Sequence, residues 1–222
     1  MQIEYIFEFD KLEKISFLVD TERELIVENT NSNEYIWTQL EYHKCPNCSL
    51  KGEKYCPAAL DIQKIFEYFS DLASFERIDV TVIAPQRTYK KNCDAQSALI
   101  SLTGLIMATG KCPILSKMKP MAEFHLPFST FEESLIRTIS FYLIKQYLKK
   151  QDNEVPDYDL IGLTEHYRDL ILVNTFLKQR LDNNFTNDAN INTISSYFSL
   201  SALIERTLDE QLEDVRHYFE SI

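Results

Sequence analysis

Three cysteines stand within the stretch CPNCSLKGEKYC, residues 45–56, of a chain that has five cysteines in all. Cys45 and Cys48 have the spacing at which a tight turn presents two thiolates to one metal ion. Cys56 follows after a segment that contains Gly52, which can adopt turn conformations closed to other residues. Structural zinc takes four ligands in a tetrahedron. The sequence therefore predicts a zinc site whose fourth ligand comes from elsewhere in the chain.

Three residues are candidates for that fourth ligand. Cys112 comes first, because it lies in another proline-rich segment and, like Cys45 and Cys56, is followed directly by proline. His43 comes second, because the H-x-C-x-x-C spacing is short enough for its ring to reach the metal. Cys93 comes third, because it stands at an expected helix start, where a thiol more often simply packs. The predicted ligand set is Cys45, Cys48, Cys56 and Cys112.

The same cysteine pattern has other interpretations. An iron–sulfur cluster also needs four thiolates, and its cysteines are also found before prolines, so it is the less favoured alternative to zinc. Unlinked thiols, a disulfide and a redox pair are further alternatives. A redox C-x-x-C normally begins a helix beside a strand, whereas this one is expected in a loop. A structural metal is therefore the preferred interpretation.

Charge and glycine content exclude several function classes. The net charge is −11, with −15 in residues 1–40 and 151–222 together and +4 in residues 41–150. The acidic ends weigh against nucleic-acid binding, which needs a basic surface. The chain has only four glycines and no glycine-rich phosphate loop. No secretory signal is seen, and the longest apolar stretch is too short to span a bilayer. We expect a cytoplasmic protein without membrane association.

Hydrophobic periodicity predicts both strands and helices. Alternating apolar residues predict an antiparallel meander over residues 2–28, including ISFLVD (15–20) and LIVEN (25–29), and a further strand at 78–82. Segment 111–128, with three prolines, is expected to be a loop. Apolar residues at spacings of three and four predict helices. These helices are expected at about 57–72, 95–106, 130–150, 163–181 and 204–219.

The predicted fold class is α+β. It comprises an N-terminal antiparallel meander, a cysteine-rich loop, helices packed on a small sheet, and a C-terminal helical hairpin. Residues 1–150 are expected to form an α+β domain that carries the metal-binding loop. Residues 151–222, after a polar linker, are expected to form a helical hairpin that packs on this domain or on a partner subunit.

A second group of residues is a candidate for catalysis. His125 stands near Glu132 in FHLPFSTFEE, and Arg87 follows an expected strand. A histidine beside a carboxylate can transfer protons. A structural interpretation is favoured, because Thr130 and Glu133 form a capping box and Glu132 suits the helix N-terminus. His125, Arg87 and Glu132 therefore remain the catalytic candidates of an alternative function only.

Two stretches resemble a known family. EYHKCPNCSLKGEKYCPAA and GKCPILSKMKPMAEFHLPFSTFEESLIRTISFYLIKQYL are similar to an uncharacterised bacterial family classed only as a domain of unknown function, over about residues 40–150. The likeness lies in three Cys-Pro pairs and in PMAEFHLPF. The resemblance implies that Cys45, Cys48, Cys56 and Cys112 form one set and that Cys93 lies outside it. It implies no activity, substrate or partner.

The sequence thus favours a non-enzymatic function. We expect a zinc-stabilised cytoplasmic interaction or regulatory module that binds a protein partner or associates with itself as a homodimer. The alternative is an enzyme or small-ligand-binding protein that uses the 111–128 loop, with His125, near the metal site.

Overall fold

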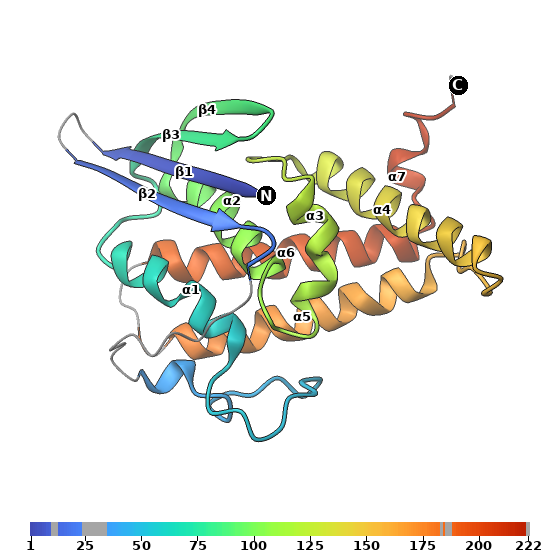
Figure 1. Ribbon diagram of the computed structural model, residues 1–222, viewed down its shortest axis with the longest axis horizontal. Helices are drawn as coiled ribbons and strands as arrows, with labels where there is room; N and C mark the ends of the chain where they lie inside the picture. The colour runs from blue at the N-terminus through green and yellow to red at the C-terminus, as the bar shows by residue number, and fades with distance from the viewer. Residues whose placement is uncertain (10–12, 24–34, 183, 185–187, 221–222) are drawn as a thin grey trace.

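The computed structural model describes residues 1–9, 13–23, 35–182, 184 and 188–220. Its N-terminal half is built on a four-stranded antiparallel sheet in the order β2-β1-β3-β4 (Figure 1). The predicted α+β class is confirmed. The strands are β1 (Gln2–Phe9), β2 (Glu13–Asp20), β3 (Arg77–Ala84) and β4 (Arg87–Asp94).

The inner strand β1 follows from its alternating sequence. Ile3, Tyr5 and Phe7 are fully buried on one face of the sheet, as period-two spacing requires. In register, Tyr5 lies opposite Phe17 of β2 and Val82 of β3. Strands β1, β2 and β3 therefore present a continuous apolar face to the helices.

One expected strand cannot be compared with the structure, and one strand of the sheet was not expected. The expected strand at 25–29 lies outside the described residues. Strand β4 was not predicted, because RTYKKNCD is polar on both faces and shows no alternation. It forms the edge beyond β3, and its exposed lysines are typical of edge strands that avoid pairing with other chains.

Two helices cover the apolar face of the sheet. Helix α1 (Pro57–Tyr68) begins with proline in its first turn, where no backbone donor is needed. Helix α2 (Ala95–Ala108) begins at Asp94, whose carboxylate accepts a hydrogen bond from the Ser97 N–H at 2.8 Å. Helix α2 is apolar on almost all sides because it lies between the sheet and a third layer of helices (Figure 1).

That third layer is the predicted C-terminal hairpin. Helices α5 (Ile161–Asp182) and α6 (Asp188–Asp209) lie side by side, and α6 also packs on α2 of the same chain. The prediction of one helix continuing to Phe219 is wrong. Helix α6 ends because Gln211 and Leu212 adopt left-handed backbone conformations, and a short separate helix α7 (Glu213–Arg216) follows.

The segment between α2 and α5 contains more helix than expected. Helix α4 (Phe131–Gln151) begins with the predicted capping box of Thr130 and Glu133. The expected loop at 111–128 is partly helical, with a 3-10 turn η3 (Leu115–Met118) and a short helix α3 (Lys119–Glu123). Pro120 does not prevent this, because it occupies the first turn of α3.

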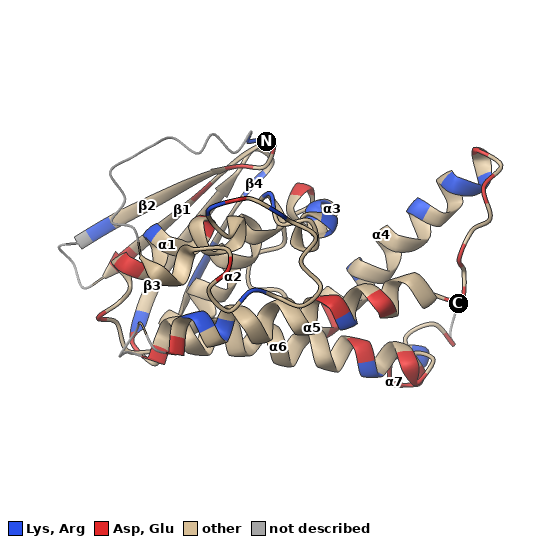
Figure 2. Ribbon diagram, turned by 90° about the horizontal axis from the view of Figure 1, so that it is seen from below, with Lys and Arg blue, Asp and Glu red and all other residues tan. Residues whose placement is uncertain are grey.

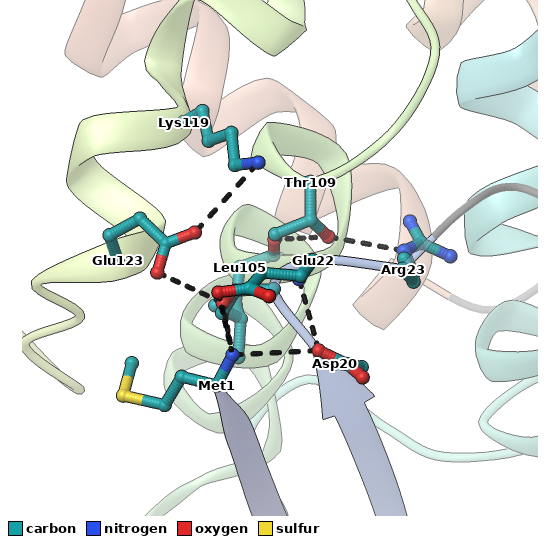
Figure 3. A network of polar contacts seen from close by, with 9 residues as sticks. Met1, Asp20, Glu22, Arg23, Leu105, Thr109, Lys119 and Glu123 are labelled. Atoms are coloured by element: carbon teal, nitrogen blue, oxygen red, sulfur yellow. Dashed lines mark hydrogen bonds and ion pairs between the residues drawn. The ribbon is translucent and has the colours of Figure 1, made fainter.

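Polar contacts fasten the sheet to the helices at the chain start (Figure 3). The Met1 ammonium donates to Thr21 Oγ1 at 3.0 Å, and the Thr21 hydroxyl donates to Glu123 of α3 at 3.0 Å. Arg23 donates to Thr109 Oγ1, just beyond α2, at 3.2 Å. The β1–β2 hairpin is thereby held to both α2 and α3. Among the described helices, none combines the length and the apolar character that crossing a bilayer requires.

Candidate metal site and ligand cavity

The cysteine loop, which we define as residues 38–56, closes on itself through backbone pairing. The Leu40 N–H donates to the Lys54 carbonyl at 3.0 Å, and the Cys56 N–H donates to the Thr38 carbonyl at 2.8 Å. Inside the loop, the Cys48 N–H donates to the Cys45 carbonyl at 3.0 Å, which makes the tight turn expected of C-x-x-C. The loop is thus a closed structure with all three of its thiols at fixed positions.

Arg180 of α5 fixes this loop to the C-terminal hairpin. Its guanidinium donates to the carbonyl oxygens of Trp37, Gln39 and Leu40 at 2.9, 2.6 and 2.9 Å. The Arg180 side chain is only 1% exposed, and its Nε has no partner among the described residues. In the middle of the loop, Asn47 donates to Asp169 Oδ1 of α5 at 2.8 Å.

Four of the five cysteines line one small cavity beside α5. Cys45, Cys48 and Cys56 come from the cysteine loop, and Cys112 comes from the segment that follows α2. The cavity measures about 20 Å³, enough for one water-sized sphere. All five thiols are free. Among the described residues, no group of three or more His, Cys, Asp or Glu side chains is arranged so that it could hold a metal ion. The four thiols thus line a common space, but they are not gathered as the ligands of one ion would be.

The two other candidates for the fourth ligand lie elsewhere. His43 is exposed, with its ring packed against Tyr42, and it does not line the cavity. Cys93 is buried in β4, where it pairs with Ile78 of the sheet, and it is also absent from the cavity wall. Of the three candidates, Cys112 is the one that the fold brings to the other thiols.

Burial favours the protonated form of three thiols, those of Cys45, Cys56 and Cys112. It raises the pKa of Cys45 to about 12, and the nearby Cys56 adds to the rise. Burial also raises the pKa of Cys56 and of Cys112. The positive charge of Arg180 acts in the opposite direction on Cys45 and Cys56. Without a bound cation these thiols remain protonated at neutral pH, because a buried thiolate would lack compensating charge.

A second and much larger cavity, of about 510 Å³, lies between α2, residues 115–131 and the α5–α6 hairpin. We refer to it as the large cavity. Volumes in this range are typical of small-molecule sites. Its wall is mainly apolar, with a few polar side chains from several elements. The polar residues include Lys91, Ser101, His125, Arg137 and Asn174.

His125 faces the large cavity at the end of a buried hydrogen-bond chain. Its Nε2 lies 2.5 Å from the Tyr5 hydroxyl, which lies 2.6 Å from the Ser101 hydroxyl. The Ser101 hydroxyl also accepts the Phe128 N–H at 3.1 Å. Burial, assisted by the positive charge of Arg137, lowers the pKa of His125 to about 3. The imidazole is therefore neutral at physiological pH.

The structure does not bring the other catalytic candidates to His125. Arg87 is exposed at the tip of the β3–β4 hairpin, and Glu132 is exposed on the first turn of α4. Neither residue lines the large cavity. Glu133 and Arg137, four residues apart on α4, have separate hydrogen-bond partners. Glu133 completes the capping box, while Arg137 donates to the carbonyl oxygens of Met121 and Phe124.

Two residues of interest in α5 were not predicted as functional. Arg180 falls on the apolar stripe of α5, seven residues after Val173 and three after Leu177, both of which line the cysteine cavity. A charge on a buried stripe was the signal that would have singled it out. Asn174 is a buried polar residue of the same helix, and it lines the large cavity.

Fold and sites together define an α+β protein with four thiols that line one small cavity and a larger, partly open cavity of a size that suits a small molecule. The chain belongs to the family described as Domain of unknown function (DUF6901), whose model matches residues 3–220. The match extends over both ends of the chain, beyond the central part that carried the resemblance in the sequence. The same comparisons found no match among curated proteins and none among solved structures.

Proposed function

We propose that this protein is a zinc-stabilised cytoplasmic module that acts by binding rather than by catalysis. The observation that carries the proposal is the convergence of Cys45, Cys48, Cys56 and Cys112 on one cavity, from two segments far apart in the chain. Four thiolates are a common ligand set for structural zinc. Binding would draw the four sulfur atoms inward to about 2.3 Å from the metal.

Charge balance supports the same proposal. Zinc with four thiolates carries two net negative charges, which a buried site must offset. Arg180 is a buried cation whose described hydrogen bonds go to neutral carbonyl groups, and its field reaches Cys45 and Cys56. It would therefore supply part of the compensating charge. A cavity of about 20 Å³ also suits a single ion better than an iron–sulfur cluster.

Elemental analysis of purified protein tests the metal. We expect one zinc per chain in the wild type and in Cys93→Ser, which serves as the matched control. Cys112→Ser should lose most of the metal. Cobalt substitution should give the visible spectrum of a tetrahedral thiolate site. If the purified protein contains no metal and keeps its stability in the presence of a chelator, this proposal is refuted. If the protein is brown and contains iron, the site holds an iron–sulfur cluster and not zinc.

We further propose that the module binds a second copy of itself. The C-terminal half of α4 extends away from α5 and α6 (Figure 2). It exposes Ile144, Tyr147 and Leu148, which share one face of the helix at 56%, 57% and 56% exposure. Val155, in the segment after α4, is 90% exposed. Exposed apolar surface of this extent is typical of protein interfaces, and a two-fold axis would bury it against itself.

Light scattering tests the homodimer. We expect the wild type to have the mass of two chains and Tyr147→Glu to have the mass of one. The control is Tyr218→Glu, which changes an equally exposed tyrosine outside α4. If the wild type has the mass of one chain even at high protein concentration, self-association is refuted. The partner would then be a different protein.

A second candidate function is small-ligand binding. The observation that favours it is the large cavity, which His125 faces from the predicted 111–128 segment. Catalysis by His125 with Arg87 and Glu132 receives no such support, because those two residues do not line the cavity.

A further inference from the structure

We propose that the large cavity binds a small amphiphilic carboxylate, a molecule with an apolar body, an anionic head and a hydroxyl group. This inference rests on the second candidate function, small-ligand binding, and names the class of ligand. It is independent of zinc. Three features of the cavity wall carry it, one for each part of the molecule.

The first feature is an adaptable apolar wall. Met107, Met118 and Met121 line the cavity together with aliphatic residues of α2, α5 and α6. Methionine side chains are flexible and polarizable, so they adjust to irregular apolar shapes. A volume of about 510 Å³ accommodates a chain or ring system of lipid or drug size. The wall therefore fits the apolar body of the ligand.

The second feature is an excess of positive charge. Lys91 and Arg137 line the cavity, whereas none of its described lining residues is Asp or Glu. Such an arrangement is notable in a chain with a net charge of −11. Lys91 lies opposite Val80 in the sheet, and Val80 is buried beneath the helices, so Lys91 belongs to the cavity face of β4. Two cations without a lining counter-charge favour an anionic head.

Both cations are already positioned. The Lys91 ammonium lies 5.2 Å from the ring centroid of Phe128, another lining residue. Arg137 is half-buried, and its donations to the carbonyls of Met121 and Phe124 hold it against α3. His125 adds no charge, because its imidazole is neutral, and its Nε2 is hydrogen-bonded to the Tyr5 hydroxyl. The attraction for an anion therefore comes from Lys91 and Arg137.

The third feature is an unused hydrogen-bond acceptor. Asn174 is only 2% exposed and lines the cavity from α5. Its Nδ2 donates to the Ser201 hydroxyl at 3.2 Å, whereas Oδ1 has no partner among the described residues. A buried amide oxygen without a donor is costly, so this position calls for one from a ligand. A hydroxyl group on the apolar body would supply it.

Isothermal titration calorimetry with four probes tests the proposal. The probes are dodecanoate, omega-hydroxydodecanoate, dodecanol and dodecyltrimethylammonium. They differ in head charge and in the presence of a second polar group. We expect both carboxylates to bind one per chain, about tenfold or more tighter than dodecanol, because a charge-assisted contact is lost in the alcohol. The cationic probe should not bind. The hydroxy acid should bind more tightly than dodecanoate.

Four variants and one control variant assign the contacts. Lys91→Met should weaken both carboxylates severalfold and leave dodecanol unchanged. Lys90→Met is the matched control, because Lys90 is the exposed neighbour on the opposite face of β4. Asn174→Leu should abolish the advantage of the hydroxy acid over dodecanoate. Arg137→Met should not bind the carboxylates. Arg137→Lys retains the positive charge and should still bind them. Circular dichroism checks that each variant is folded.

The outcomes separate the two levels of the proposal. If none of the four probes binds to folded wild type, small-ligand binding itself is refuted. If dodecanol or the cation binds as tightly as dodecanoate, the cavity binds ligands but the assigned class is wrong. If the hydroxy acid binds no more tightly than dodecanoate, or if Asn174→Leu leaves the difference in affinity unchanged, the assignment of a ligand hydroxyl group to Asn174 is wrong.

Discussion

Single buried polar residues distinguish this protein from an ordinary α+β domain. Arg180 joins the cysteine loop to α5, and Asn174 presents an unpaired oxygen to the large cavity. His166, also on α5, has no hydrogen-bond partner for either ring nitrogen among the described residues. Natural proteins seldom leave such groups unpaired. One helix thus carries three polar side chains that each leave at least one buried polar atom without a partner among the described residues.

His166 should make stability depend on pH. Burial, helped by Lys117 and Lys145 and opposed by Asp169, lowers its pKa from 6.5 to about 4. Because the unfolded chain then binds a proton more readily, the free energy of unfolding falls as the pH drops from 6.5 to 4. The difference corresponds to at most roughly 3 kcal/mol.

Urea unfolding of the wild type and of His166→Leu at pH 7 and pH 4 measures this effect. The variant loses no hydrogen bond, so its stability should fall less between the two pH values. His217→Leu, which changes an exposed histidine, is the control. Equal losses in wild type and His166→Leu would show that His166 does not titrate in this way.

At the scale of elements, close contact between α2 and α6 determines how the hairpin docks. Gly104 of α2 faces Tyr197 of α6, and the Tyr197 hydroxyl donates to the Ile100 carbonyl. A Cβ on Gly104 would lie 2.5 Å from the Tyr197 hydroxyl oxygen and 3.3 Å from its Cζ. The two helices therefore approach as closely as they do because residue 104 has no side chain.

Gly104→Ala should destabilise the protein by about 2 kcal/mol, although alanine favours helices, because overpacking forces α2 and α6 apart. Tyr197→Phe removes the clashing oxygen, so the double variant should lose less stability than the two single variants together. A double-mutant cycle by chemical denaturation gives this coupling. Strictly additive losses would contradict direct contact between the two side chains.

Helices and strands could be predicted where their sequence patterns involve only neighbouring residues. The capping box at Thr130, the proline at the start of α1 and the alternation in β1 all depend on neighbouring residues. Strand β4 has no apolar period, since it is held by pairing with β3 rather than by burial. The end of α6 depends on Gln211 and Leu212, which adopt left-handed conformations. Neither is a glycine, so the sequence does not indicate these conformations.

The candidate sites follow the same division. The spacing of Cys45 and Cys48 indicated a shared turn, and the Cys-Pro pairs indicated Cys112, which lines the same cavity. The large cavity could not be predicted from the sequence, because it lies between segments that are far apart in the chain. The sequence made His125 a catalytic candidate because Glu132 is near it in the chain. In the fold, its hydrogen-bond partner is Tyr5.

At the scale of the whole molecule, the two predicted parts share one core. Buried residues of the sheet, of α1 and α2, and of the C-terminal hairpin form a single hydrophobic cluster. Asp157, in the expected linker, accepts hydrogen bonds from the Tyr142 hydroxyl and the Gly162 N–H at 2.7 and 2.8 Å. The segment between α4 and α5 therefore connects two parts of one body.

A fragment ending at residue 160 should consequently have an open cysteine loop. It lacks Arg180, Asp169 and the α5 side chains that line the cysteine cavity. We expect Cys45, Cys48 and Cys56 to react with a maleimide much faster in the fragment than in the full chain, as measured by mass spectrometry. Equal labelling rates in the two proteins would show that the loop closes without the hairpin.

The contact between Arg180 and the Trp37 carbonyl spans 143 positions of sequence. A growing chain leaves the ribosome from its N-terminus, so the three early cysteines emerge long before the residue that holds their loop in place. Until α5 is synthesised, their sulfur atoms are open to oxidants and to metal ions. Helix α5, made well after the cysteines, ends this exposure.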